Sequence, residues 1–110
     1  MSKSAEDKVR QIIIANTRVD VETVNHHRHY VNPGKSLADD LGFDNFEIAR
    51  LAAPISWALG VDLPLGRLPI KKIRHMTVGQ LMHAATTLTG VVSLNELERA
   101  LDEIGESTSR

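Results

Sequence analysis

The chain has 110 residues and a net charge of −1, with a pI near 6.5. This size suits one domain, and the charge excludes the strongly basic footprint of many nucleic-acid-binding domains. Cysteine is absent, which excludes disulfides, thiolate metal sites and cysteine nucleophiles. Only 4% of the residues are aromatic, so we expect an aliphatic core. The N-terminal stretch MSKSAEDKVRQIII has no signal-peptide pattern, and no apolar run approaches membrane-spanning length. We therefore expect a cytoplasmic protein without a transmembrane segment.

The first predicted element is a helix over residues 5–16. Ser4 is a suitable N-cap, and Asp7 follows at capping-box spacing. Apolar residues recur on one face at helical spacing, namely Val9, Ile12 and Ile13.

Residues 17–43 form a long predicted connection, and a loop of this length in a compact domain tends to be functional. The stretch NHHRHY places His26, His27 and His29 close together. We expect a solvated loop cluster, because no ligand spacing recurs; a shared metal ion is the alternative. Towards the end of the connection, three apolar residues are expected to point inward: Leu37, Leu41 and Phe43.

A second helix is predicted to begin after Asp44, whose carboxylate can accept backbone N–H groups of the first turn. Glu47 completes a capping box. The expected core face is Ile48, Leu51, Ala52, Ile55 and Leu59. Pro54 lies inside the pattern and predicts a kink over residues 50–54, and Gly60 should end the helix. We expect Trp57 to be half-buried beside the core, with a ligand-lining role as the alternative.

Two helices are predicted over the next part of the chain. Residues 69–74 allow a short one. Thr77 then caps a longer one, TVGQLMHAATTL, which Gly90 should end. Its inward residues are predicted to be Val78, Leu81, Met82 and Ala85.

A last amphipathic helix is predicted over residues 93–104. Ser93 and Glu96 form a capping box, Gly105 should close the helix, and residues 106–110 should be a flexible tail. The inward residues are Leu94, Leu97, Leu101 and Ile104. We favour packing on its own domain over a weak dimer through 93–104, because the apolar repeat is short. The helix is acidic and could meet the basic segment 67–74.

The stretches SLADDLGFDNFEIARL, WALGVDLP and MTVGQLMHAA, in this order, give the chain a family likeness. Over residues 5–89 the chain resembles the acyl carrier proteins. The resemblance implies an all-α fold: a four-helix bundle in residues 1–90, with a long loop between its first two helices. Residues 91–105 are then an additional C-terminal helix packed on the bundle.

In the acyl carrier proteins, a serine in an Asp-Ser-Leu triplet bears a 4′-phosphopantetheine arm. The matching triplet here is Asp44-Asn45-Phe46, so Asn45 stands at the position of the attachment serine. Attachment needs an alcohol oxygen that attacks a phosphate of coenzyme A, and an amide is a poor nucleophile. Ser36 and Ser56 lie too far along the chain to replace it. We therefore expect the family's cofactor to be absent from this chain.

The resemblance also implies docking on partner enzymes through the second and third helices. That surface is usually acidic, but residues 44–74 here carry five cations and three anions, a balance of +2. Arg50 stands where the family tends to have glutamate. The predicted docking residues are Glu47, Arg50, Arg67, Lys71, Lys72 and Arg74. The stretch KKIRH has no interleaved aromatics, so we expect no nucleic-acid partner.

The function that follows is an acyl-carrier-like domain of fatty-acid, lipid or polyketide metabolism, whose partners are acyl-transfer or synthase-type enzymes. As written, with Asn45, it should not be modified. The alternative is a non-catalytic protein-interaction module on the same scaffold. We expect no enzyme, because the sequence has no nucleophile–His–acid set, no Gly-rich phosphate loop and no convincing metal motif.

Overall fold

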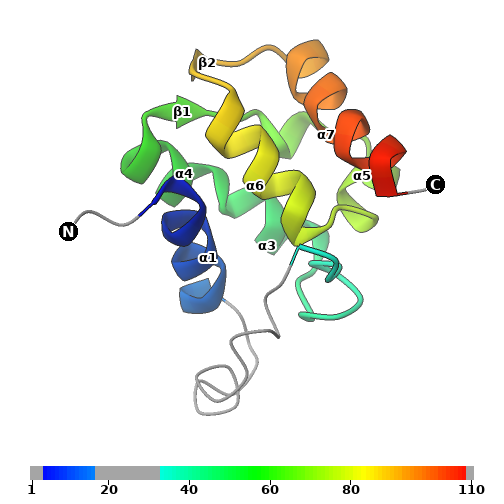
Figure 1. Cartoon of the computed structure of the whole chain (residues 1–110). Coiled ribbons are helices and arrows are strands. Elements are labelled where there is room, and N and C mark those ends of the chain that lie inside the picture. Colours follow the sequence, from blue (N-terminus) through cyan, green and yellow to red (C-terminus); the bar gives the residue numbers. More distant parts are fainter. Residues whose placement is uncertain (1–3, 17–32, 109–110) are drawn as a thin grey trace.

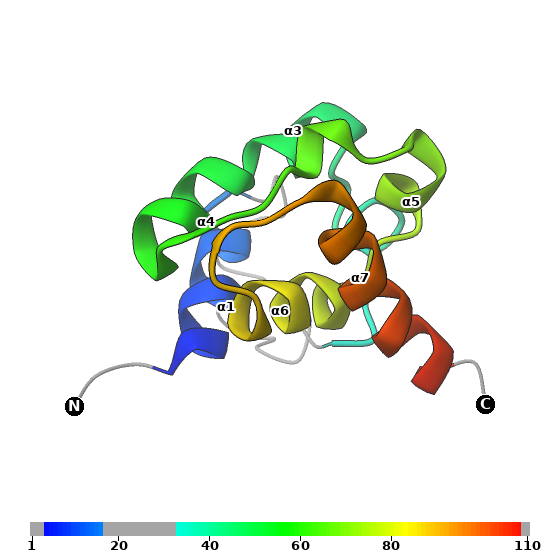
Figure 2. The ribbon, with the colours of Figure 1, turned by 90° about the horizontal axis from the view of Figure 1, so that it is seen from above.

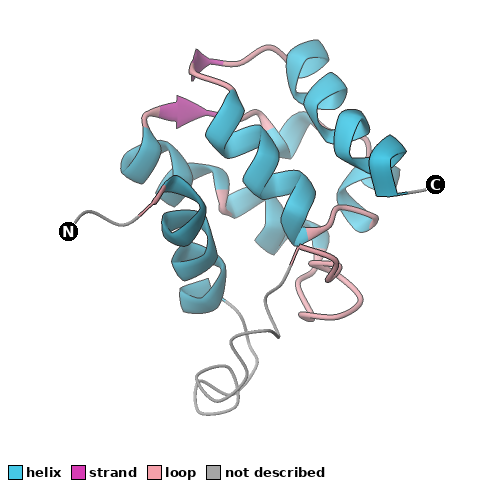
Figure 3. Cartoon of the chain, in the orientation of Figure 1, coloured by secondary structure: helices cyan, strands magenta, loops and turns pink. Residues whose placement is uncertain are grey.

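The computed structural model of the chain describes residues 4–16 and 33–108, with side chains up to Ile104. His26, His27 and His29 lie outside the described residues. The described chain is mostly helical, which agrees with the expected all-α class (Figures 1 and 3). None of its described helices is both long and apolar enough to cross a bilayer.

Helix α1 (Ala5–Asn16) begins and ends as predicted. The Ser4 hydroxyl accepts the Asp7 N–H at 3.1 Å, which caps the first turn. At the other end the Asn16 side-chain amide donates to the Ile12 carbonyl at 2.8 Å. Both ends of the helix are therefore closed by its own side chains.

The predicted second helix is two helices in the structure, α3 (Asn45–Arg50) and α4 (Ala52–Leu59), which meet at Leu51. Pro54 lies in the first turn of α4, where a missing backbone N–H removes no hydrogen bond of that helix. The predicted kink is thus confirmed as an interruption just before the proline. Gly60 caps α4 at φ 71°, and its N–H donates to the Ser56 carbonyl at 2.8 Å.

The chain then forms β1 (Val61–Asp62), the 3₁₀ turn η2 (Leu65–Arg67) and α5 (Ile70–Arg74). Strand β1 pairs in parallel with β2 (Gly90–Val91), with Val61 opposite Gly90. The two strands lie side by side at one end of the molecule (Figure 3). The prediction that Gly90 ends the preceding helix is wrong, because that helix stops at Thr87 and Gly90 belongs to β2.

Helix α6 (Val78–Thr87) lies between α1 and α7 (Leu94–Thr108) and also contacts α4 (Figure 2). Thr77 and Gln80 form its capping box, as Thr77 was predicted to do. All four side chains predicted to point inward from this helix are buried: Val78, Leu81, Met82 and Ala85. Helix α6 therefore packs against three other helices, α1, α4 and α7.

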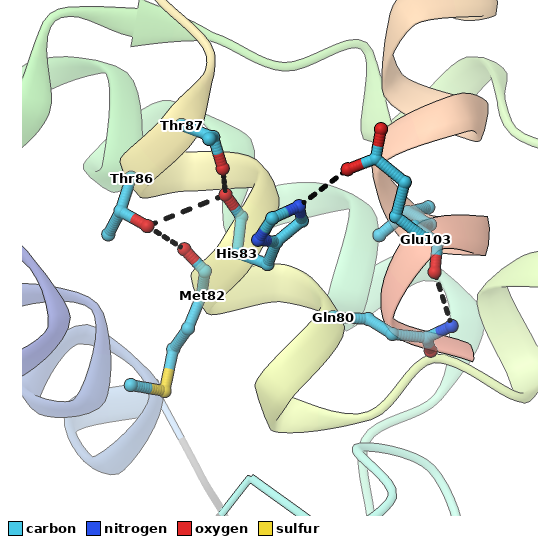
Figure 4. Close-up of polar contacts among 7 residues, drawn as sticks. Gln80, Met82, His83, Thr86, Thr87 and Glu103 are labelled. Carbon is cyan, nitrogen blue, oxygen red and sulfur yellow. Dashed lines mark hydrogen bonds and ion pairs between the residues drawn. The ribbon is translucent and has the colours of Figure 1, made fainter. Parts of the chain in front are cut away.

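Helix α7 packs on α6 within the same chain, as favoured from the sequence. Its buried side chains are Leu97, Ala100 and Leu101. Among the described residues, three polar contacts of a side chain join it to α5 and α6, two of them drawn in Figure 4. The His83 Nε2 and Glu103 Oε2 atoms are 3.0 Å apart, and the Gln80 amide donates to the Leu101 carbonyl at 3.0 Å.

The third contact is an ion pair of 2.8 Å between Lys72 of α5 and Asp102 of α7. The acidic helix therefore meets the basic segment 67–74 inside one chain. The prediction that Gly105 closes the last helix is wrong, because α7 continues to Thr108. Glycine lowers helix propensity by about 1 kcal/mol but does not by itself end a helix.

Candidate functional site

A chain reversal over residues 36–43 sets the position of the start of α3. The Leu37 N–H donates to the Met76 carbonyl, and the Phe43 N–H donates to the Leu37 carbonyl, both at 3.0 Å. Gly42 has φ 78°, a left-handed value that glycine adopts without strain. The three apolar residues predicted as anchors are all buried: Leu37, Leu41 and Phe43. The reversal is thus fixed to the core immediately before Asp44.

Asp44 and Glu47 form the predicted capping box. The Asp44 carboxylate accepts the Glu47 N–H at 2.7 Å, and the Glu47 carboxylate accepts the Asp44 N–H at 3.1 Å. Each acid therefore satisfies a backbone donor that the helix leaves open. Both carboxylates are therefore hydrogen-bonded to the backbone at the start of α3.

Asn45 is the first residue of α3, held directly behind the cap. Its side chain is half-buried. An amide there can donate and accept hydrogen bonds, but it offers no alcohol oxygen for covalent attachment. Of the two serines considered as substitutes, the Ser36 hydroxyl accepts the Asp39 N–H at 3.1 Å, and Ser56 lies in α4.

The outward face of α3 and α4 carries aromatic side chains. Phe46 is 71% exposed and Trp57 is 92% exposed, so the expectation of a half-buried tryptophan is wrong. Arg50 and Ala53 lie between them and are exposed. The guanidinium carbon of Arg50 lies 5.8 Å from the centre of the Phe46 ring, within cation–π range. We call these four residues the outer stripe.

The sequence already contained a signal for the outer stripe. Its residues follow i, i+4, i+7 and i+11, a helical spacing that places them opposite the buried Ile48, Leu51 and Ile55. This phase places Trp57 away from the core, in contrast to the expectation that it is half-buried beside it.

Two basic elements flank α3. Both η2 and α5 contact α3, and a Cβ at Gly66 of η2 would lie only 3.8 Å from that of Ala49. Arg67, Lys71 and Arg74 on these elements are exposed. Lys72, also predicted as a docking residue, instead directs its charge to Asp102. The structure thus brings most of the predicted docking cations to elements that adjoin α3.

A surface hollow of about 550 Å³ lies beside the break between α3 and α4. Small side chains line much of it, including Ala49, Ala52 and Ala53, and Arg50 and Glu47 supply charge. It shares Arg50 and Ala53 with the outer stripe. An apolar side chain from outside the chain would fit a recess of this kind.

Within residues 4–16 and 33–104, no three His, Asp or Glu side chains are placed to hold a metal ion. His75 is exposed at the end of α5, and His83 contacts Glu103.

No protein-family model, curated protein or solved structure matches this chain. These comparisons therefore assign no family to the chain.

Proposed function

We propose that this chain is an acyl-carrier-protein-like helical domain that docks on partner proteins and bears no phosphopantetheine arm. The observation that carries the proposal is the start of α3. The Asp44–Glu47 capping box fixes Asn45 as the first residue of a surface helix, where the family resemblance calls for the attachment serine.

The order of elements supports the carrier scaffold. Among the described elements, helix α1, the pair α3–α4, the short α5 and then α6 follow the order that the resemblance implies for the helices of a four-helix bundle. Under this proposal α3 and α4 together are the second helix of the bundle. Helix α7 is the additional C-terminal element, held on α6.

The chemistry of attachment explains why the residue at position 45 determines whether the chain can bear the arm. A serine oxygen there would attack the pyrophosphate of coenzyme A. A phosphodiester to the arm would form, and adenosine 3′,5′-bisphosphate would leave. The serine proton would pass to a base of the transferase or to solvent. The Asn45 amide has no comparable nucleophilic oxygen, because its lone pairs are delocalised or weakly basic.

A non-catalytic interaction module on this scaffold is the second candidate, and the outer stripe favours it. Two of the chain's four aromatic residues, counted as one Trp, one Tyr and two Phe, stand exposed on one helical face. Under either candidate the α3–α4 surface meets a partner protein. The two candidates differ in whether that surface still fits a phosphopantetheinyl transferase.

The test is restoration of the missing oxygen. The parent chain and Asn45→Ser are incubated with coenzyme A and a phosphopantetheinyl transferase of broad specificity, and intact masses are recorded. The matched control is Asn95→Ser, because Asn95 is exposed and lies in the first turn of α7. We expect only Asn45→Ser to gain the mass of the arm. If no variant gains mass, the carrier proposal fails and the interaction module is favoured.

A further inference from the structure

We propose that the outer stripe, with the basic elements beside it, binds a protein partner whose contact surface combines apolar side chains with Asp and Glu. This inference rests on the proposed function, since it names the partner class for the docking surface of that domain. It uses the outer stripe, Ile70 of α5 and the cations Arg67, Lys71 and Arg74.

The composition of the stripe is that of an interface centre. Trp, Arg and aromatic residues are enriched in interfaces, and Trp and Arg lead among residues that carry most of the binding energy. Phe46, Arg50 and Trp57 supply these types along roughly 16 Å of helix, at 1.5 Å per residue. Ile70, 65% exposed on the adjoining α5, extends the apolar area. A chain with so few aromatics gains no core packing from these side chains, so their exposure needs another explanation.

Charge selects the kind of partner. Among the described residues none forms an ion pair with Arg50, Arg67, Lys71 or Arg74. The two acids at the start of α3, Asp44 and Glu47, each accept a backbone N–H of their own capping box. The four cations of this surface thus outnumber the two acids, whose carboxylates already accept backbone N–H groups. Complementary charge governs encounter rate and partner choice, so the surface favours an acidic partner.

The hollow beside the α3–α4 break gives the partner a place to anchor. It shares Arg50 and Ala53 with the outer stripe, and its other lining residues are two further alanines together with Asn16, Phe43, Glu47 and Pro54. An apolar side chain seated there would lie next to a cation that can pair with a carboxylate one helical turn away. An amphipathic acidic helix has both groups at the required spacing, and helix-in-groove binding uses this pattern.

The experiment is an unbiased selection. A library of random peptides of about 16 residues, long enough for a helix of roughly 24 Å, is displayed on phage and selected on the full chain. Enriched peptides are synthesised, and their affinity is measured by the fluorescence of Trp57, the chain's single tryptophan. We expect enriched peptides to carry net negative charge with interspersed apolar residues, and to shift the Trp57 emission to shorter wavelength as the ring is buried.

Four variants assign the binding to the surface. Trp57→Ala and Arg50→Glu should each weaken the selected peptides about tenfold or more, as expected for central interface residues. Affinities for Trp57→Ala are read by calorimetry, because the fluorescent reporter is lost. Val91→Ala removes another exposed apolar side chain, and Arg99→Glu reverses another exposed cation; both should leave affinity within about twofold. All substituted positions are exposed, and thermal unfolding confirms that each variant is folded.

Several results would overturn the inference. Enrichment of neutral or basic peptides, absence of any binder, or binding that Trp57→Ala leaves unchanged would each do so. Binding to phosphatidylcholine–phosphatidylserine vesicles that Trp57→Ala and Arg50→Glu abolish would assign the surface to a membrane instead. A dimer in light scattering that Trp57→Ala dissociates would assign it to a second copy. If no acidic peptide binds but Asn45→Ser gains the arm, the proposed function stands and the docking inference fails. If acidic peptides bind but Asn45→Ser gains no arm, only the docking surface stands.

Discussion

Gln80 joins two helices through the two ends of one amide. Its carbonyl oxygen accepts the Thr77 N–H at 2.9 Å and closes the capping box of α6. Its NH₂ group donates to the Leu101 carbonyl of α7 at 3.0 Å (Figure 4). The side chain is half-buried, so neither partner is freely replaced by bulk water. A single residue thus contributes both to the start of α6 and to the docking of α7.

Replacement of Gln80 by methionine tests this double role. Methionine has a similar length but neither hydrogen bond, so the free energy of unfolding should fall by about 1–3 kcal/mol. The matched control is Gln11→Met on the exposed face of α1, which should change it by less than about 0.5 kcal/mol. Urea denaturation followed by circular dichroism gives both values. Equal effects at the two positions would show that the Gln80 contacts contribute nothing specific.

The sequence predicted the contacts or exposure of some side chains correctly and of others not. The paired Asp44 and Glu47 could be read from sequence because a capping box depends only on spacing within one turn. The position of Trp57 could not be read from its apolar character, because exposure depends on which face of the helix meets the core. Lys72 illustrates a third case: its partner Asp102 lies thirty positions away, and only the packing of α7 brings the two charges together.

The short helix α3 depends on its N-terminal cap. Helix α3 has six residues, too few to be stable by hydrogen bonding alone. Its start is fixed by Asp44, and its end gives way to α4 at Leu51. The cap therefore determines where Asn45 and Phe46 are presented.

Removal of the cap should destabilise the chain measurably. For Asp44→Ala we expect a loss of about 1 kcal/mol in the free energy of unfolding, as found for N-cap residues in general. Asp44→Ser should restore most of that loss, because a serine hydroxyl can accept the same N–H. Thermal or urea unfolding measures both variants. A serine variant as unstable as the alanine variant would contradict a capping role.

Most element boundaries could be predicted because local signals mark them. Ser4, Thr77 and Gly60 each act within one turn, and each is found in its predicted place. The strand pair β1–β2 could not be predicted, because two residues are too few to show alternation and the partners are far apart in sequence. The error at Gly105 has a different origin, since glycine is only a weak local stop signal without a following breaker.

For the whole molecule, α7 covers α6 mainly through apolar contact. Leu97 is fully buried between the helices, and Ala100 and Leu101 lie beside it. The ion pair Lys72–Asp102 has side chains that are 32% and 58% exposed. Solvent screens such a pair, so its contribution is about 0–1 kcal/mol.

Two substitutions separate these contributions. Leu97→Ala should lower the free energy of unfolding by about 2–5 kcal/mol, the range for truncation of a buried leucine. Asp102→Asn should lower it by less than about 1 kcal/mol. Urea titrations at low and high salt measure both, and the Asp102→Asn difference should shrink as salt rises. A larger loss for Asp102→Asn than for Leu97→Ala would show that charge rather than packing holds α7.

We propose that the whole domain is a carrier-type scaffold, which presents residue 45 for attachment and lacks only the oxygen. The most direct measurement is the intact mass of Asn45→Ser after incubation with coenzyme A and a phosphopantetheinyl transferase, with the modified residue located by fragmentation. We expect an added arm on residue 45 of the variant and an unchanged mass for the parent. An unmodified variant, an arm on another serine, or a modified parent chain would contradict it.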